Sequence, residues 1–437
     1  MVAVDQSDSA WEIEDSLEEL ARLVESVDAE VVGSLTQKLS RPVAGTYIGK
    51  GKVTELKELV ALHEAEMVVV NDELTPSQLR NLETALDIKV IDRTAIILDV
   101  FARRAQTHEG RLQVELAQLE YRLPRLTRLW THLSRQARGG VGVRGPGETQ
   151  LESDRREAQK RITFIKGQLT QVHRHRQIYR ERRTKEGIPV VALVGYTNAG
   201  KSTLLNALSG SDVYAQDQLF ATLDPTTRRI TLPNGTPVLV TDTVGFINKL
   251  PTLVIAAFRA TLEEINEATV LVHVLDASHP NVGEQYRTVN SVLAELEADD
   301  KQTIVAINKI DRCGVGTVPE LPNVIRSIGL ESPFVPVSAL HHVGFEDLGT
   351  AITQAIELER DLQMITVQIP YSRGDLVDRF HTLAAVQTQS HDEAGTQLTG
   401  RLPVAAVDGF RPFIVHQTPL PTPTEIIPPS KSTTARR

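Results

Sequence analysis

Short apolar runs and amphipathic stretches alternate along the first hundred residues of the chain. Apolar runs of strand length occur at 2–5, 30–37, 66–72 and 88–92. The segments between them have the three- and four-residue apolar spacing of helices, and Thr75 followed by Pro76 is typical of a helix N-cap and first helical position. The alternation predicts an N-terminal α/β domain with a parallel sheet over residues 1–108.

From about residue 109 the apolar positions follow the spacing of a heptad. The first run comprises Leu112, Leu116, Leu119, Leu123, Leu126, Trp130 and Leu133, and the second Leu151, Ala158, Ile162, Ile165, Leu169 and Val172. Between them, five glycines in residues 139–147 favour a reversal of the chain over a continuous helix. We expect an antiparallel helical hairpin at 109–186 with a Gly-rich tip loop at 137–148, and a kink or break at Pro124.

The remainder of the chain again alternates strands and helices. A buried strand at 188–195 opens a second α/β pattern, which predicts a domain at 187–360. A strand at 364–370, a helix from Ser372 and a β-hairpin around 391–395 predict a small C-terminal α+β domain at 361–417. The tail, 418–437, is rich in Pro, Ser and Thr and is expected to be disordered.

Composition excludes several classes of protein. The 437 residues include no run near the ~18 apolar residues of a membrane helix, and the acidic N-terminus does not resemble an export signal. The single cysteine, Cys313, excludes an internal disulfide and a cysteine-based metal site. We expect a cytoplasmic protein, a monomer without stable membrane insertion, while peripheral association with membranes stays open.

Charge is distributed unevenly along the chain. Between Phe101 and Gly187 there are 20 Lys and Arg against 9 Asp and Glu, a net charge of +11, whereas the rest of the chain carries −20. A basic hairpin on an acidic protein indicates local electrostatic docking, although a solvated helical face would have a similar pattern.

A phosphate-binding motif follows the strand at 188–195. GYTNAGKST, at 195–203, fits G-x-x-x-x-G-K-[ST] and precedes a helical sequence, so its N–H groups are expected to surround phosphates. Lys201 is expected to reach the β- and γ-phosphates, and the N–H of Gly245 the γ-phosphate. The predicted phosphate-binding residues are Gly195, Tyr196, Thr197, Asn198, Ala199, Gly200, Lys201, Ser202, Thr203 and Gly245.

Further motifs at strand ends indicate guanine rather than adenine. DTVG, at 242–245, supplies Asp242, and NKID, at 308–311, supplies Asp311, whose carboxylate can accept from both N1–H and the 2-amino group of guanine. VSAL, at 337–340, offers main-chain N–H groups for the guanine carbonyl. The predicted guanine-binding residues are Asn308, Lys309, Asp311, Ser338 and Ala339. Four motifs in this order predict a GTP-binding and GTP-hydrolysing P-loop domain of the Ras-like class.

The segment FATLDPTTR, at 220–228, lies where Ras-like proteins place a mobile loop that contacts magnesium. The predicted switch loop comprises Phe220, Ala221, Thr222, Leu223 and Asp224. Thr222 is the expected Mg²⁺ ligand, with Thr226 and Thr227 as alternatives. Ser202 and, through water, Asp242 complete the predicted magnesium site, and GTP and GDP are the predicted ligands.

These motifs, together with FRATLEE at 258–264, YIGKGKVTELKE at 47–58 and GGVGVRGPGETQLE at 139–152, resemble those of the HflX family of translational GTPases over nearly the whole chain. The resemblance implies binding to the large ribosomal subunit and its rRNA, with the hairpin tip near the peptidyl-transferase centre. It also implies splitting or rescue of stalled or stressed ribosomes. The candidate contacts are Arg138, Gly139, Gly140, Arg144, Gly145 and Gly147.

Two residues bear on the hydrolysis mechanism. Phe246 follows DTVG, where many Ras-like GTPases have the glutamine that orients water, so intrinsic hydrolysis is expected to be slow and to accelerate on the ribosome. Asn198 is a candidate ligand for K⁺, by analogy with similar NAGKS loops, or else a stabiliser of the loop.

Other functions remain open at this stage. Lys50 and Lys52, in YIGKGKVTELKE, belong to a possible second nucleotide site or a contact with RNA phosphates. One alternative is a non-ribosomal RNA-binding NTPase with ATP-driven unwinding through the N-terminal domain. Another is a scaffold whose protein partner is switched by GTP.

Overall fold

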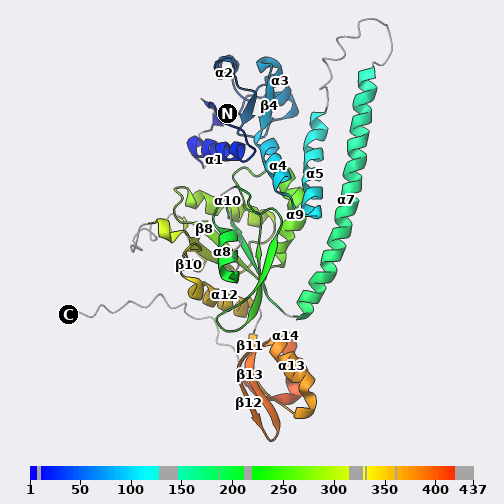
Figure 1. The fold of residues 1–437 in the computed structure, drawn as a ribbon, viewed down its shortest axis with the longest axis vertical. Coiled ribbons are helices and arrows are strands. Elements are labelled where there is room, and N and C mark those ends of the chain that lie inside the picture. Colours follow the sequence, from blue (N-terminus) through cyan, green and yellow to red (C-terminus); the bar gives the residue numbers. More distant parts are fainter. Residues whose placement is uncertain are drawn as a thin grey trace, which may run out of the picture.

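The structure is a computed structural model that describes residues 1–6, 11–126, 146–186, 188–210, 219–313, 328–329, 332–359 and 362–418. Figure 1 shows an N-terminal domain, a long helical hairpin beside it, a central domain and a C-terminal domain at the opposite end. The candidate tip residues from Arg138 to Gly145 and the tail from residue 419 lie outside the described residues.

The N-terminal domain contains a parallel sheet, as predicted. Its strands are β1 (Val2–Asp5), β2 (Leu35–Lys38), β3 (Met67–Val70) and β4 (Lys89–Asp92), in the order β2-β1-β3-β4. Its helices are α1 (Ile13–Glu25), α2 (Lys50–Leu62), α3 (Pro76–Leu86) and α4 (Arg93–Arg104). The strand predicted at 30–37 was placed to begin too early. The observed strand, β2, begins at Leu35, which pairs with Val2, the first residue of β1, so the residues before Leu35 have no partner in β1.

The predicted start of α3 is confirmed. The Thr75 hydroxyl accepts the N–H of Gln78 at 3.2 Å, and the Gln78 side chain accepts the N–H of Thr75 at 3.0 Å. This capping box satisfies two N–H groups that the helix itself leaves unpaired, and Pro76 occupies the first turn.

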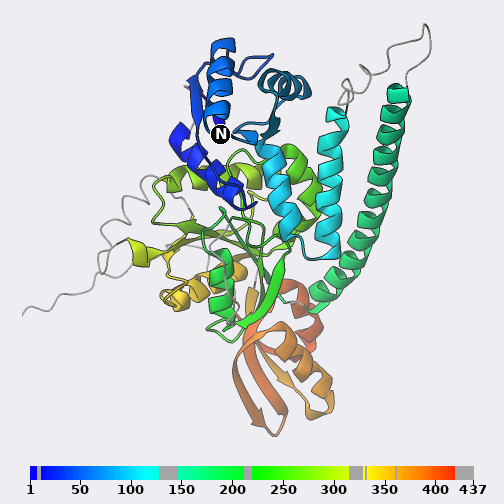
Figure 2. The same cartoon turned by 45° about the horizontal axis from the view of Figure 1, so that its top comes forward.

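The hairpin pairs α5 (His108–Arg122) with α7 (Pro146–Glu186), and Figures 1 and 2 show them side by side with opposite chain directions. The predicted apolar stripes meet in one cluster, which comprises Leu112, Leu116, Ile162, Ile165 and Leu169 with Leu119 and Leu123. Pro124 ends α5, as predicted, in the 3-10 turn η1 (Leu123–Arg125). The tip was predicted too long, because α7 begins at Pro146 and includes Gly147; proline is favoured in the first turn of a helix.

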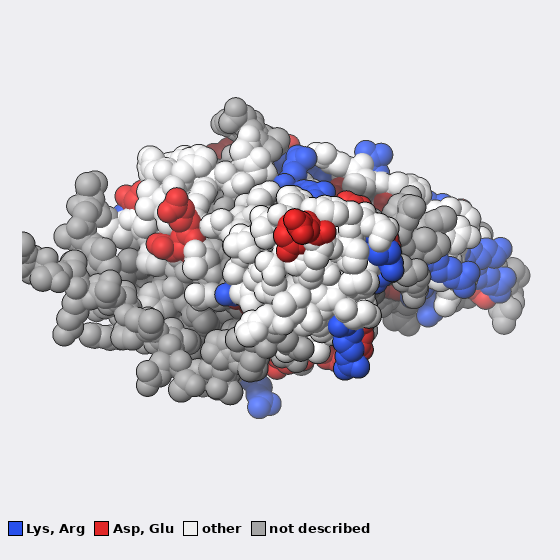
Figure 3. Space-filling model, turned by 90° about the horizontal axis from the view of Figure 1, so that it is seen from below, with Lys and Arg blue, Asp and Glu red and all other residues white. Residues whose placement is uncertain are grey.

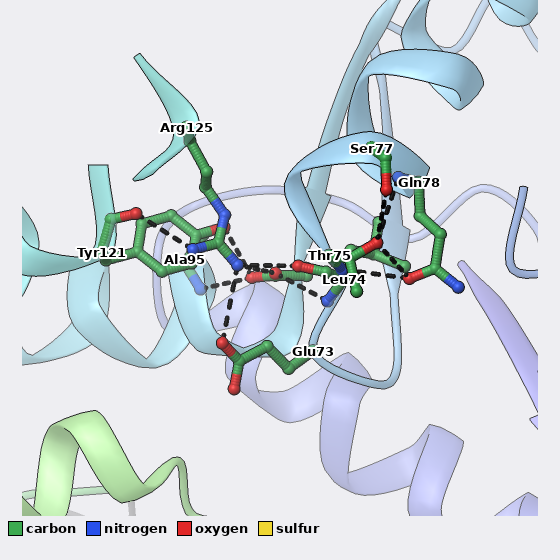
Figure 4. Close-up of polar contacts among 9 residues, drawn as sticks. Glu73, Leu74, Thr75, Ser77, Gln78, Ala95, Tyr121 and Arg125 are labelled. Atoms are coloured by element: carbon green, nitrogen blue, oxygen red, sulfur yellow. Dashed lines mark hydrogen bonds and ion pairs between the residues drawn. The ribbon is translucent and has the colours of Figure 1, made fainter. Parts of the chain in front are cut away.

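The end of α5 is fixed to the N-terminal domain through Asp92, which is fully buried. Figure 4 shows the residues that bond to it, Leu74, Ala95, Tyr121 and Arg125. Its Oδ1 accepts the N–H of Ala95 at 2.9 Å and the Tyr121 hydroxyl at 2.8 Å. Its Oδ2 accepts the N–H of Leu74 at 3.0 Å and the Arg125 guanidinium at 3.3 Å. One carboxylate thus joins α4, the loop before α3, and the end of the first hairpin helix.

The central domain has a six-stranded sheet in the order β10-β9-β8-β5-β7-β6, with only β6 antiparallel to its neighbour among the described strands. The strands are β5 (Val190–Gly195), β6 (Thr226–Thr231), β7 (Pro237–Asp242), β8 (Val270–Asp276), β9 (Thr303–Asn308) and β10 (Phe334–Pro336). The helices are α8 (Lys201–Ser209), α9 (Thr252–Glu267), α10 (Val282–Glu295) and α12 (Phe345–Glu359), with the 3-10 turn η2 (Ile310–Arg312). All four motifs lie at the carboxyl ends of strands, where ligands bind in open α/β sheets.

The C-terminal domain is α+β, as predicted. An antiparallel sheet in the order β12-β13-β11-β14 packs on α13 (Gly374–Leu383) and α14 (Val404–Val407). Its strands are β11 (Leu362–Ile369), β12 (Ala385–Asp392), β13 (Gly395–Pro403) and β14 (Ile414–Thr418), with the 3-10 turns η3 (Tyr371–Arg373) and η4 (Asp408–Phe413). The hairpin expected around 391–395 joins β12 to β13.

The N-terminal and central domains share one hydrophobic core. A single cluster includes Leu20 from α1, Phe101 from α4, Tyr196 from the phosphate loop and Phe220 from the switch loop. In Figure 2 the N-terminal domain lies above the central domain, and the hairpin runs down the right-hand side from the N-terminal domain past the central domain. The residues that are predicted to bind nucleotide therefore lie next to the domain boundary.

Candidate functional site

The phosphate loop connects β5 to α8, as predicted. Gly200 has φ +96°, and a Cβ there would come within 3.0 Å of the Asn308 amide nitrogen, so glycine is required by both conformation and space. The Lys201 ammonium folds back over the loop and donates to the carbonyls of Gly195 at 3.1 Å and Tyr196 at 2.8 Å. Burial lowers the pKa of Lys201 to about 8, against the opposing effect of the Asp242 charge.

Three oxygen-bearing side chains converge beside this loop. Asp242 Oδ2 accepts the Ser202 hydroxyl at 2.6 Å and the Thr222 hydroxyl at 2.8 Å, and these two hydroxyl oxygens are 2.8 Å apart. Asp242 is buried, which raises the pKa of its carboxyl, and its Oδ1 has no hydrogen-bond partner among the residues that the structure describes. Hydroxyl and carboxylate oxygens are the donors that Mg²⁺ prefers, so the three side chains fit a magnesium ion.

The structure separates Thr222 from the two alternative threonines. Thr226 and Thr227 belong to β6, and the Thr227 hydroxyl is 2.9 Å from the Thr241 hydroxyl of the neighbouring strand. Of the three threonines, Thr222 is the one that contacts the other two predicted ligands, Ser202 and Asp242, directly.

Asn308 links two of the predicted loops to each other. Its amide nitrogen donates to the Ala199 carbonyl at 2.9 Å, and its Oδ1 accepts the N–H of Ala339 at 3.0 Å. The Asn308 side chain thus joins the phosphate loop to the segment after β10. Its neighbour Lys309 has φ +61° and pairs with Asp276 at 2.7 Å, a partner that the sequence analysis missed.

Asp311 and Ser338 are also brought together, because the Ser338 hydroxyl donates to Asp311 Oδ1 at 2.5 Å. The N–H of Ser338 donates to the Val343 carbonyl at 3.1 Å, and that of Ala339 to Asn308. The prediction that these N–H groups contact the guanine carbonyl stays a prediction; in the structure both are bonded within the protein.

The segment after DTVG lies beside the phosphate loop. The N–H of Thr197 donates to the Phe246 carbonyl at 2.7 Å, and the N–H of Phe246 donates to the Gly195 carbonyl at 3.1 Å. Gly245 lines the same cavity as Lys201 and Thr222. The Phe246 ring is buried in the core, and a phenyl ring has no polar group that could bind a water molecule.

Tyr196 connects the phosphate loop to the N-terminal domain. Its hydroxyl donates to Glu19 of α1 at 2.5 Å and accepts the N–H of Asn248 at 2.6 Å. Burial and the Glu19 charge raise the pKa of Tyr196, which keeps its proton on the oxygen. Glu19 also pairs with the buried Arg93 at 2.6 Å. Sequence analysis missed Glu19 as the partner of Tyr196. The available signal was its place among the apolar core positions of α1, where an acidic residue needs a partner.

Exposed basic side chains follow the described part of the hairpin. On α7 they are Arg155, Arg156, Lys160, Arg161, Lys166 and Arg174. Figure 3, viewed from the end of the C-terminal domain, shows basic side chains at the side where Figure 1 places the hairpin. None of the helices in the described ranges combines the length and apolar character that a membrane crossing requires.

Three family models match the chain in succession. The model described as GTP-binding GTPase N-terminal matches residues 14–102, and the GTP-binding GTPase Middle Region matches 104–183. A third, described as 50S ribosome-binding GTPase, matches 190–309. Together they span the N-terminal domain, the hairpin and most of the central domain.

Curated relatives match over most of their own length. The GTPase HflX of Caldanaerobacter subterraneus subsp. tengcongensis is 46% identical over 407 residues, which cover 93% of this chain and 92% of that protein. The GTPase HflX of Escherichia coli (strain K12) is 43% identical over 391 residues, with 89% and 90% covered. That of Lacrimispora saccharolytica is 50% identical over 318 residues, with 73% and 75% covered.

Proposed function

This chain belongs to the HflX family of GTPases and is a GTP hydrolase, and we propose that its GTP cycle controls binding to the large ribosomal subunit. We further propose that binding serves the splitting or rescue of stalled or stressed ribosomes. The observation that supports the proposal most strongly is the basic hairpin, which is joined to the GTPase domain through a shared core.

The dimensions and charge of the hairpin suit a crevice lined with RNA phosphates. Helix α7 has 41 residues, which at about 1.5 Å per residue gives a rod of about 60 Å. Its exposed Lys and Arg side chains would neutralise phosphates and release counterions, so binding should weaken steeply as salt concentration rises. The candidate ribosome contacts of the tip are Arg138, Gly139, Gly140, Arg144 and Gly145, with Gly147 at the start of α7.

Within the GTPase domain, we assign the β- and γ-phosphates to the main-chain N–H groups of residues 195–203 and to Lys201. Asp311 and Lys309 are assigned to the guanine base. Ser202, Thr222 and Asp242 would hold Mg²⁺, which supplies charge neutralisation at the phosphate oxygens when bound. Asn198, exposed in the phosphate loop with φ +62°, is our candidate ligand for K⁺.

Position 246 has no side chain that could orient the attacking water for GTP hydrolysis. The buried Phe246 cannot accept the hydrogen bond that a glutamine would, so we propose that the ribosome completes the site and accelerates hydrolysis. Equal GTPase rates with and without large subunits would contradict this part of the proposal.

The proposal is tested by sedimentation of large ribosomal subunits with the protein and either GDP or a non-hydrolysable GTP analogue. We expect co-sedimentation with the analogue, reduced binding with GDP, and loss of binding on deletion of residues 139–147. A charge-reversed variant, Arg155→Glu with Arg156→Glu, should bind less tightly and with a shallower salt dependence. Arg373→Glu, which changes an exposed arginine in the C-terminal domain, far from the hairpin, serves as the control. Binding that is unaffected by the deletion would refute the role of the hairpin.

A further inference from the structure

The switch loop is anchored to the N-terminal half of the molecule on both sides of Thr222. Two residues before Thr222, Phe220 packs edge-on against Phe101 of α4, with ring centroids 4.6 Å apart. Both rings are buried. Two residues after it, Asp224 contacts the start of α5. The threonine assigned to magnesium therefore lies between two contacts with elements outside the GTPase domain.

Asp224 makes a compact set of hydrogen bonds at the start of the hairpin. Its Oδ2 accepts the N–H groups of Gln106 and Thr107, both at 2.9 Å. Its Oδ1 accepts the Thr107 hydroxyl at 2.5 Å. That hydroxyl in turn accepts the N–H of Gly110 at 2.9 Å and is the N-cap of α5. A carboxylate at a helix N-terminus is also favoured by the helix dipole.

The first turn of α5 leaves room for this carboxylate. A Cβ on Gly110 would come within 3.0 Å of Asp224 Oδ1 and 3.2 Å from the Thr107 hydroxyl oxygen. Glycine is otherwise costly inside a helix, by about 1 kcal/mol relative to alanine. The absence of a side chain at Gly110 is therefore accounted for by the approach of Asp224.

We propose that Asp224 is a positioning residue for Thr222, and that its contact with Thr107 couples occupancy of the magnesium and nucleotide site to capping of the first hairpin helix. This inference rests on the assignment of Thr222 to magnesium made above. With Phe220 held against Phe101, fixing Asp224 restricts the short segment that carries the Thr222 hydroxyl. Coupling between two equilibria is reciprocal, so nucleotide with magnesium should strengthen the cap as much as the cap strengthens binding.

The test measures the dissociation rate of a fluorescent non-hydrolysable GTP analogue in Mg²⁺ and in EDTA. For Asp224→Ala we expect dissociation about 5-fold or more faster in Mg²⁺ and unchanged in EDTA. Asp224→Asn, which keeps one acceptor oxygen, should lie between this variant and the wild type. An unchanged rate for Asp224→Ala in Mg²⁺, or an equal acceleration in EDTA, would overturn the proposal.

Gly110→Ala provides an independent route to the same state, because the added Cβ displaces Asp224 without altering any charge. We expect it to accelerate dissociation as Asp224→Ala does, and the double variant to be no faster than either single one. Gly167→Ala, in α7, where an added Cβ meets no atom within 4 Å, is the matched control and should have the wild-type rate. Additive effects of the two changes would contradict a shared contact.

Hydrogen exchange separates the coupling from a local effect on the nucleotide. In the wild type, the N–H groups of Gln106, Thr107 and Gly110 should exchange more slowly once the analogue and Mg²⁺ are bound. In Asp224→Ala this protection should be absent. Thr222→Ala distinguishes the two proposals. If it leaves the Mg²⁺ dependence unchanged, the metal assignment and this inference both fail. If it alone alters that dependence, only the role of Asp224 fails.

Discussion

Helix α5 is held at its two ends by aspartates from different domains, and the two carboxylates differ in surroundings. Asp92 is fully buried, and its four partners belong to the N-terminal domain and the end of α5 (Figure 4). Asp224 is half-buried and reaches α5 from the switch loop. The end of α5 is thus bonded to the N-terminal domain. The start of α5 is bonded to the switch loop, the segment that is expected to respond to nucleotide.

This difference indicates which parts of the molecule move together. A buried carboxylate with four partners is expensive to separate from them, so the N-terminal domain and α5 should behave as one body. Asp224 is more accessible, and each of its bonds has a smaller net free energy. A nucleotide-dependent rearrangement should therefore release the start of α5 before its end.

The largest expected effect is that of Asp92→Ala. The change leaves Arg125 and the Tyr121 hydroxyl without their buried acceptor, and we expect a loss of about 3–5 kcal/mol in the free energy of unfolding. Urea unfolding followed by tryptophan fluorescence would measure it. A loss as small as that of an exposed cap, about 1 kcal/mol, would remove the contrast between the two aspartates.

Arg125→Met should have a smaller effect of about 2 kcal/mol. It removes one donor to Asp92 and the guanidinium that lies 3.6 Å from the centre of the Tyr121 ring, but the apolar chain of methionine retains part of the packing. The same unfolding experiment applies, with Arg122→Met as a neighbouring control. If nucleotide dissociation also changed, the end of α5 would be coupled to the GTPase site, contrary to our interpretation.

Tyr196→Phe tests the other contact between the N-terminal domain and the phosphate loop. It removes the hydroxyl between Glu19 and the N–H of Asn248, while Glu19 keeps its pair with Arg93, so a loss of about 1 kcal/mol is expected. Hydrogen exchange at Asn248 should increase in the variant. Unaltered protection there would mean that the Tyr196 hydroxyl contributes nothing to the order of this segment beyond the packing of the shared core.

Arg161→Ala is expected to have the smallest effect. Arg161 pairs with Glu115 across the hairpin at 2.6 Å, but both side chains are exposed, and exposed ion pairs contribute little. We predict a thermal midpoint within experimental error of the wild type at moderate salt. A clear destabilisation would show that surface pairs, in addition to the apolar cluster, hold α5 against α7.

Elements with a strong local signal could be predicted from sequence. The helix N-cap at Thr75, the break at Pro124 and the strands that precede the GTPase motifs depend on residues near each other in the chain, and all three are confirmed. The start of the strand predicted at 30–37 was wrong because it is decided by the length of β1, a distant partner. The tip was misjudged by three residues because Pro146 favours a first helical turn.

The candidate site divides in the same way. The motifs predicted which loops come together, and Ser202, Thr222 and Asp242 do meet. The sequence could not reveal that Asn308 bonds to two loops, that Asp276 pairs with Lys309, or that Asp224 contacts Thr107, since these partners are brought together only by the fold. A single residue such as Gly110 gives no sequence signal for its contact until the fold shows which side chain approaches it.

The bridge made by the Asn308 amide has a consequence for recognition. The side chain of Asn308 joins the segment that is expected to contact the base to the segment that is expected to contact the phosphates. The two loops that are expected to bind a guanine nucleotide are therefore already held at a fixed distance from each other. Little binding free energy is then lost to ordering these loops. Selection between bases can therefore act at the first encounter, before any switch segment has closed.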